Sequence, residues 1–234
     1  MLKAVKNNFE NLFHLFFPNP CLGCGKQLFK SEEMLCMGCE SQLHVTPFHE
    51  HQHNFVSEKF VGRAKIETAT SMLLFAKEGM VQHLIHLLKY QNKKEVGVFL
   101  GKKYGKLLAI EQDYSTIDCI VPVPLHATKK IKRGYNQSEL FAEGLAEMLD
   151  VELFKDGLTR LSLGESQTRK KKFERWKNVE HDFDCPNESL LENKHILLVD
   201  DVLTTGATLD ACCSVLNQIK GAKVSVATIA VVMK

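Results

Sequence analysis

Residues 196–208 read ILLVDDVLTTGAT, and this stretch decides how the rest of the chain is interpreted. Four apolar residues at 196–199 predict a buried strand, which ends in the adjacent carboxylates of Asp200 and Asp201. A turn of small and hydroxyl residues follows, and apolar residues then recur with helical spacing from Leu209 to Ile219. The pattern is therefore a strand, a loop and the start of a helix.

The loop between this strand and this helix has the composition of a phosphate site. The first N–H groups of a helix have no partner inside it, and the helix dipole favours an anion there. Gly206 allows the backbone to approach the anion closely. Asp200 and Asp201 repel phosphate, so we expect them to bind sugar hydroxyls or a metal ion that itself contacts phosphate. The expected phosphate-binding residues are Thr204, Thr205, Gly206, Ala207 and Thr208.

This stretch resembles the phosphoribosyl pyrophosphate loop of type I phosphoribosyltransferases. The resemblance implies that Asp200 and Asp201 bind the 2- and 3-hydroxyls of the ribose, and that residues 204–208 bind the 5-phosphate. The alternative is a plain strand–turn–helix with a threonine cap. A cap, however, requires one threonine and no paired carboxylates.

Strand and helix patterns alternate from about residue 69 onwards and predict the fold class. Strands are expected at 70–76, 117–123, 151–154, 195–199 and 224–232, and helices at 81–88, 96–107, 137–149 and after Gly206. This alternation is typical of an α/β fold with a parallel sheet and helices on both faces. Ligands of such sheets bind at the carboxyl ends of the strands. The phosphate loop and the loop after Val123 are therefore expected at the same edge.

A cationic loop is expected after the strand at 117–123. Pro122 and Pro124 end that strand, because a central strand does not continue through proline. The pyrophosphate loop of phosphoribosyltransferases occupies this place in the chain order. The resemblance therefore implies that pyrophosphate binds His126, Lys129 and Arg133. A solvated run of charge is the alternative.

Two Cys-x-x-Cys pairs near the N-terminus predict a metal site. Each pair can direct two thiolates at one ion, and two pairs complete a tetrahedral site. We therefore expect a closed, structural zinc site formed by Cys21, Cys24, Cys36 and Cys39. Redox disulfides or four core cysteines are the alternatives.

Charge is unevenly distributed along the 234 residues. The net charge is +2, but residues 129–133 and 169–177 together carry +9, which leaves −7 on the remainder. This asymmetry predicts anion-binding surfaces on a mildly acidic body. The second segment suits single-stranded nucleic acid, with phosphates on its cations and bases on its tryptophan, or else a flap over the site. Its candidate residues are Arg169, Lys170, Lys171, Lys172, Arg175 and Trp176.

Cysteine usage and hydropathy indicate the compartment. The cysteines do not form the framework of a small secreted domain, which favours a reducing compartment. No run of 18 apolar residues occurs, so no transmembrane helix is expected. Residues 2–17 have an apolar face that predicts a helix packed on the body, and no cleavage site follows them.

The combination of these features resembles the ComF family of competence-associated proteins. Members join a four-cysteine zinc module to a type I phosphoribosyltransferase domain. The family's Pro-Val-Pro-Leu-His and Arg-Gly-aromatic-Asn-Gln segments match Pro122–His126 and Arg133–Gln137, and the Lys89-Tyr90 region also resembles a family stretch. A middle segment matches at Arg160, Ser166, Gln167, Arg175, Asn178, Val179 and Phe183.

We accordingly expect an N-terminal helix and zinc module at residues 1–55 and a phosphoribosyltransferase-like domain at residues 56–234. The resemblance implies phosphoribosyl pyrophosphate and Mg²⁺ as ligands, a cytoplasmic location, and a role with other DNA-uptake proteins in natural transformation. Three activities stay open. The domain transfers phosphoribosyl groups, with Asp200 and Asp201 holding the sugar at the catalytic site, or it senses phosphoribosyl pyrophosphate without turnover, or the chain binds single-stranded nucleic acid.

Overall fold

The computed structural model describes residues 19–161 and 182–233. The chain divides into two compact units, Met1–His44 and Val45–Lys234. The domain boundary expected between residues 55 and 56 lies inside the second unit. The predicted helix at residues 2–17 and the cationic segment at 169–177 lie outside the described residues. None of the described helices has both the length and the hydropathy that crossing a membrane requires.

Residues 19–44, the part of the first unit that the structure describes, are rich in loops and have a very small core. This part contains the one-turn helix α2 (Met37–Glu40) and an antiparallel bridge between Pro20 and Gln27. The buried side chains in this part are those of Cys21, Leu28, Leu35, Cys39 and Leu43. So few apolar side chains give little stabilisation by burial, and small domains of this kind commonly depend on a metal or on disulfides.

The second unit is built on a five-stranded sheet in which every pairing is parallel. Across the sheet the order is β1 (Ala69–Leu74), β7 (Lys223–Val231), β6 (His195–Leu203), β2 (Cys119–Pro122) and β3 (Glu152–Leu153). All five strands lie close to the predicted positions. The α/β class with a parallel sheet is therefore confirmed.

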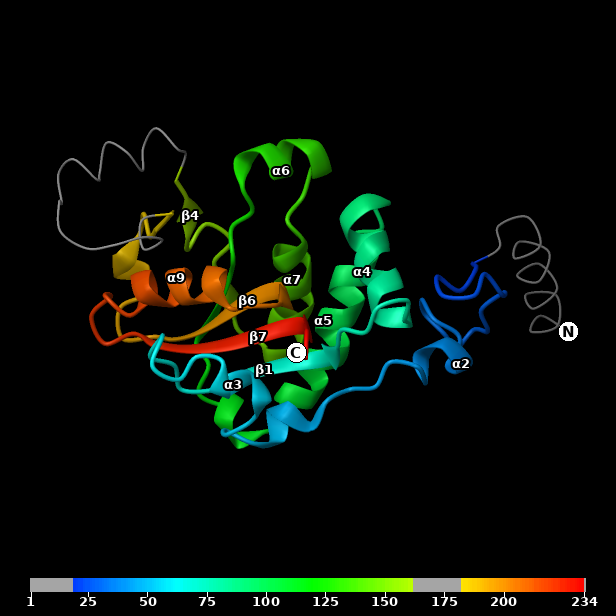
Figure 1. Cartoon of the computed structure of the whole chain (residues 1–234), viewed down its shortest axis with the longest axis horizontal. Coiled ribbons are helices and arrows are strands. Elements are labelled where there is room, and N and C mark those ends of the chain that lie inside the picture. The colour runs from blue at the N-terminus through cyan, green and yellow to red at the C-terminus, as the bar shows by residue number, and fades with distance from the viewer. Residues whose placement is uncertain (1–18, 162–181, 234) are drawn as a thin grey trace, which may run out of the picture. The chain divides into compact units, whose positions relative to one another are not determined.

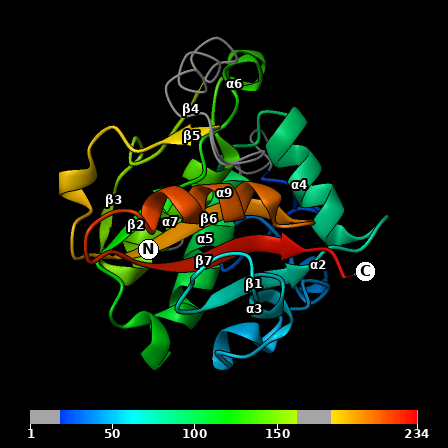
Figure 2. The same ribbon diagram turned by 60° about the vertical axis from the view of Figure 1, so that its left-hand side comes forward.

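Helices cover both faces of the sheet, as Figure 2 shows for α9 in front of β6 and β7 and for α5 and α7 behind them. Among the described residues of the second unit, the helices are α3 (Phe55–Glu58), α4 (Met80–Tyr90), α5 (Glu95–Leu108), α6 (Ala127–Arg133), α7 (Gln137–Leu149) and α9 (Ala207–Leu216). Short 3₁₀ turns lie at η1 (Pro47–Glu50), η2 (Gln112–Tyr114) and η3 (Glu188–Leu190). A Cβ atom added to Gly101 of α5 would lie 2.2 Å from the carbonyl oxygen of Phe141 in α7. These two helices therefore cross backbone to backbone.

Strand β6 is longer than the predicted strand at 195–199. It continues through both carboxylates to Leu203, because Asp200, Val202 and Leu203 remain paired with β7. Its other neighbour, β2, pairs only as far as Pro122 opposite Val199. Asp200 and Asp201 consequently lie in a part of β6 that has lost one of its two neighbouring strands. This leaves the side of the strand that faces the end of β2 open.

The open end of β6 coincides with the switch point of the sheet topology. From β2 the chain passes through α7 to β3 on one side, and from β6 it passes through α9 to β7 on the other. Open α/β sheets bind their ligands in the crevice outside the carboxyl ends of the strands at such a point. Asp200 and Asp201 lie near the carboxyl end of β6 on one side of this point, and Val123 follows the end of β2 on the other side.

Two elements differ from the sequence prediction. The expected cationic loop at 127–132 is the helix α6, which His126 caps by accepting a hydrogen bond from the Thr128 N–H and which Gly134 ends with a φ of 76°. None of its residues is buried, and it stands away from the sheet in Figure 1. An unpredicted antiparallel pair, β4 (Thr159–Arg160) and β5 (Phe183–Asp184), joins segments on either side of residues 162–181.

Candidate functional site

The predicted phosphate loop surrounds a small hollow at the start of α9. The hollow has a volume of about 40 Å³ and is lined by Asp200, Val202, Leu203 and residues 204–209. Gly206 adopts a φ of 85° at the N-cap position, a conformation that favours glycine, and no side chain caps the helix. The N–H groups of the first turn of this ten-residue helix therefore remain available to an anion.

The side chain of Arg63 contacts both ends of the junction between the phosphate loop and α9, at Thr205 and Asp210, and the sequence analysis did not identify it. Its guanidinium donates a hydrogen bond of 2.8 Å to the carbonyl oxygen of Thr205 and forms an ion pair with Asp210. The Asp210 N–H in turn donates to the carbonyl oxygen of Gly206 at 2.8 Å. Arg63 lies far from the loop in the chain and belongs to no motif, so the sequence alone gave no signal for it.

Asp200 accepts hydrogen bonds that fix its orientation. Its Oδ1 atom accepts from the Ser138 hydroxyl at 2.9 Å and from the backbone N–H of Asp201 at 2.8 Å. Burial of the carboxyl group and the neighbouring charge of Asp201 raise the pKa of Asp200 to about 7, although these hydrogen bonds and Lys89 oppose the rise.

Asp201 forms an ion pair with Lys89 from the last turn of α4. The Lys89 Nζ atom lies 2.9 Å from Oδ1 and 2.8 Å from Oδ2 of Asp201. Both side chains are largely buried, with exposed fractions of 20% for Lys89 and 16% for Asp201. The sequence analysis noticed Lys89 only through the family resemblance and gave it no role.

The Arg133–Gln137 segment does not form a free cationic loop. It makes hydrogen bonds to the end of α4, to the residue after β2 and to the start of α7. The Tyr135 hydroxyl donates to the carbonyl oxygen of Leu88 at 2.5 Å, and the Asn136 amide donates to that of Val123 at 2.9 Å. Asn136 also caps α7 by accepting from the Ser138 N–H at 3.2 Å. These contacts fix the start of α7, and with it the Ser138 hydroxyl that reaches Asp200.

The three residues expected to bind pyrophosphate all lie on α6 or at its cap. Lys129 is exposed, and His126 and Arg133 are half-buried. Arg133 donates to the side chain of Gln137 at 2.8 Å and stacks on the ring of Tyr90, with 5.3 Å between its Cζ atom and the ring centroid. Their assignment to pyrophosphate stays a prediction, as does the assignment of residues 200–208 to ribose and phosphate.

The four cysteines predicted to bind metal come together in the first unit. Their sulfur atoms all lie within 4.8 Å of one another, and those of Cys24 and Cys36 are 3.7 Å apart. Sulfur atoms bound tetrahedrally to one zinc ion are about 3.8 Å apart, given a Zn–S distance of about 2.3 Å. Against the opposing effect of burial, hydrogen bonds from backbone N–H groups lower the pKa of Cys21, whereas burial raises the pKa of Cys39 well above its usual value. The donor set and its spacing therefore fit a metal ion.

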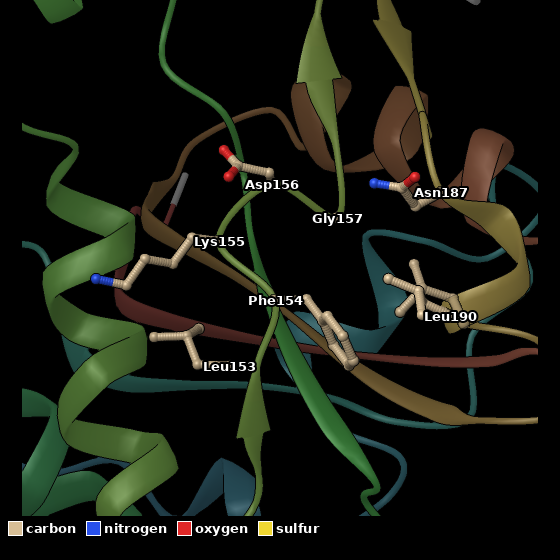
Figure 3. A pocket seen from close by; sticks show the side chains of 8 residues that line it. Leu153, Phe154, Lys155, Asp156, Gly157, Asn187 and Leu190 are labelled. Carbon is tan, nitrogen blue, oxygen red and sulfur yellow. The ribbon is translucent and has the colours of Figure 1, made fainter.

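A larger hollow of about 300 Å³ lies beside the edge strand β3, away from the predicted residues. Figure 3 shows Phe154 and Leu190 on one side of it, with Asp156 and Asn187 at its rim. Lys155 points towards α7, where it pairs with Glu139 and Glu143. The polar side chains at this hollow are few and exposed, so it lacks the converging groups that mark a binding site.

The chain has known relatives that agree with this architecture. The family model of the phosphoribosyl transferase domain matches residues 135–234, and with the parallel sheet it defines the second unit as a domain of the type I phosphoribosyltransferase fold. Competence protein ComFC of Bacillus subtilis (strain 168) is 31% identical over 214 residues, which cover 85% of this chain and 84% of that protein. The chain therefore belongs to the ComF family of competence proteins.

Two further relatives carry related names. Competence protein F of Haemophilus influenzae is 24% identical over 217 residues, covering 87% of this chain and 93% of that protein. DNA utilization protein YhgH of Escherichia coli (strain K12) is 30% identical over 131 residues, covering 54% of this chain and 56% of that protein. The predicted resemblance to the ComF family is thus confirmed.

The raised pKa of Asp200 predicts a pH-dependent cost to stability. Between its ordinary value of 3.8 and about 7, the folded chain binds more protons at this site than the unfolded chain, so stability falls as the pH rises and then levels off above 7. Asp200→Asn, which mimics the neutral carboxyl, is expected to raise the free energy of unfolding at pH 8 by about 1–3 kcal/mol. At pH 4 it should change little.

Urea unfolding at pH 4, 6 and 8 measures this effect, in buffers without added Mg²⁺. Asp156→Asn, at an exposed carboxylate away from the site, is the matched control. If Asp200→Asn raises the free energy of unfolding by the same amount at all three pH values, the prediction is contradicted.

Proposed function

We propose that the second unit binds phosphoribosyl pyrophosphate together with Mg²⁺. The proposal rests on one observation. Asp200 and the glycine-containing loop at the N-terminus of α9 line the same hollow. In this arrangement residues 204–208 bind the 5-phosphate, and Asp200 and Asp201 accept hydrogen bonds from the ribose hydroxyls. His126, Lys129 and Arg133 are proposed to meet the pyrophosphate.

The donor groups at the site fit Mg²⁺. This ion prefers oxygen ligands, keeps several waters, and binds through one or two carboxylates plus phosphate oxygens. Asp200 and Asp201 supply carboxylate oxygens at the open end of β6. When bound, the ion neutralises part of the charge of the pyrophosphate.

Two fates of the bound ligand are compatible with these residues. In transfer, a nucleophile attacks C1 of the ribose while the C1–O bond breaks and pyrophosphate leaves, and nearby cations stabilise its charge. In sensing, the ligand binds and dissociates unchanged. Both fates require the same groups that bind the ligand. Release of pyrophosphate in the presence of candidate acceptors separates the two fates.

The names of the relatives support a role in the uptake and handling of DNA. Two are competence proteins and one is a DNA utilization protein. We propose that this chain acts in the same process in the cytoplasm, with other DNA-uptake proteins as partners.

Replacing both carboxylates tests the ligand assignment. Asp200→Ala together with Asp201→Ala is expected to lower the affinity for phosphoribosyl pyrophosphate by at least about 100-fold, because two sets of hydrogen bonds to the ribose are lost. Isothermal titration calorimetry with Mg²⁺ measures this, with Asp156→Ala as control. Wild-type affinity in the double variant would overturn the assignment.

We also propose that the four cysteines of the first unit bind one structural zinc ion, as part of an N-terminal module at residues 1–55. Four thiolates complete the coordination and leave no open position for a substrate, so the site stabilises the fold and does not react. The small core of this unit supports the proposal, because metal binding supplies free energy of folding that the apolar side chains do not.

Metal analysis checks this assignment. The purified chain is expected to hold about one zinc ion, and Cys24→Ser should lose it, since three thiolates bind the ion less tightly than four. Cys185→Ser, at a buried cysteine of the second unit, should keep the metal. Wild-type protein without zinc, or with a disulfide between these cysteines under reducing conditions, would contradict the proposal.

A second candidate function, the binding of single-stranded DNA, is supported by what we call the Tyr90 surface. It consists of Tyr90, His86 and Arg133, the last residue of α6, a helix that also carries three exposed lysines. The Tyr90 ring is 66% exposed, with Arg133 stacked on it and the His86 ring at 5.1 Å. Exposed aromatic rings beside cations are the groups that bind single-stranded nucleic acid, through base stacking and phosphate contacts. This surface lies within the described residues, unlike the candidates at 169–177.

Fluorescence anisotropy with a labelled single-stranded oligonucleotide tests this function. Affinity should fall with salt, with a log–log slope of roughly 0.7 per phosphate contacted. Tyr90→Ala should weaken binding by about 1–3 kcal/mol through lost stacking. Ile110→Ala, also at an exposed apolar residue, is the control. Loss with Trp176→Ala but not with Tyr90→Ala would move the contact to the 169–177 segment, and no binding at low salt would eliminate this function.

A further inference from the structure

Lys89 is in direct contact with Asp201, one of the two carboxylates of the proposed ribose site. We propose that Lys89 makes this site specific for a ribose 5-phosphate that carries pyrophosphate at C1, by exchanging Asp201 for the pyrophosphate when the ligand binds. This inference rests on the proposed function and deepens it. It concerns how the site distinguishes phosphoribosyl pyrophosphate from ribose 5-phosphate, which have the same 5-phosphate and ribose.

The contact between Lys89 and Asp201 engages both oxygens of the carboxylate. The two N–O distances are 2.9 and 2.8 Å, so the ammonium lies across the carboxylate and uses two of its three N–H donors there. A ribose hydroxyl that approaches Asp201 must share these oxygens with Lys89 or displace it. Lysine has a long, flexible chain and a compact charge, so its ammonium can move to a nearby anion while its Cα stays in place.

The charges at the site favour such an exchange only for a ligand that brings negative charge. Without ligand, Lys89 offsets one of two adjacent carboxylates. If ribose hydroxyls took Asp201 and Lys89 gained no new partner, a largely buried ammonium would be left unpaired, which is costly. Pyrophosphate at C1 supplies the new partner, and ribose 5-phosphate has only a hydroxyl there.

The last turn of α4 is anchored on both sides of Lys89. Leu88 is fully buried, and its carbonyl oxygen accepts the hydrogen bond from the Tyr135 hydroxyl. The Tyr90 ring packs under the guanidinium of Arg133. The backbone of Lys89 is therefore fixed with respect to the segment that leads into α7. Arg133, the last residue of α6 and one of the residues proposed to meet the pyrophosphate, stacks on this turn through Tyr90, so a second cation lies next to it.

Binding of two ligands to matched variants tests the inference. Phosphoribosyl pyrophosphate and ribose 5-phosphate, each with Mg²⁺, are titrated calorimetrically into the wild-type chain, Lys89→Met, Lys89→Gln and Lys89→Arg. We expect Lys89→Met and Lys89→Gln to lose at least about 10-fold in affinity for phosphoribosyl pyrophosphate, the effect of one charge-assisted contact. Their affinity for ribose 5-phosphate should stay the same or rise, because the variants have no ammonium that this ligand would leave unpaired, and Lys89→Arg should restore most of the difference between the two ligands.

Lys93→Met removes a partly exposed lysine three residues beyond the end of α4, where it pairs with Glu95 at 3.7 Å, and serves as the control for loss of charge. A parallel loss for both ligands would assign Lys89 a purely structural role and overturn the inference. So would wild-type discrimination in Lys89→Met or Lys89→Gln, whichever variant folds by circular dichroism. A wild-type chain that binds neither ligand would instead refute the proposed function itself, and a wild-type chain that binds both equally would refute the inference alone.

Discussion

The candidate site depends on a mismatch in length between two neighbouring strands. Strand β6 remains paired with β7 up to Leu203, whereas β2 stops at Pro122 opposite Val199. Pairing with β7 keeps the backbone of β6 extended and rigid, and the missing neighbour leaves its other side open. Two carboxylates can therefore lie at the top of a central strand without being enclosed by the core, while Val199 directly before them is fully buried. If β2 were longer, Asp200 would have to pack against it.

Adjacent carboxylates at a half-buried position repel each other, and the surrounding elements offset this repulsion. Ser138 from α7 and Lys89 from α4 each contact one of the two carboxylates. The offset is incomplete, since the pKa of Asp200 remains raised to about 7. Sites that bind ligands often retain such a cost, because a fully satisfied carboxylate has less to gain from a sugar hydroxyl or a metal ion. Asp200 also lines the hollow that it shares with the loop at residues 204–209, so its carboxylate lies where a ligand of this hollow would meet it.

The Arg133–Gln137 segment connects the site to the surface of the domain. Tyr135 and Asn136 bind the backbones at the ends of α4 and β2, and the helix α7 that begins there supplies Ser138 to Asp200. On its outer side the same segment presents Arg133 to Tyr90. Ligand binding at the carboxylates and any contact made at the Tyr90 surface therefore act on the same turn of α4. This arrangement offers a physical route by which one could influence the other.

Short-range patterns in the sequence determined the strands, the long helices, the phosphate loop and the cysteine cluster. Each depends on a residue period or spacing within about 20 residues, as in the apolar run before Asp200 and the paired Cys-x-x-Cys turns. Helix α6 was not recognised, because its only marks are a histidine cap and a glycine end around a run of charge. Arg63 and Lys89 reach the site from segments distant in the chain and belong to no local pattern. Only the tertiary structure decided the roles of these two side chains, because they depend on how the packing of α3, α4 and α7 brings side chains to one edge of the sheet. It also decided where the pairing of β2 with β6 ends.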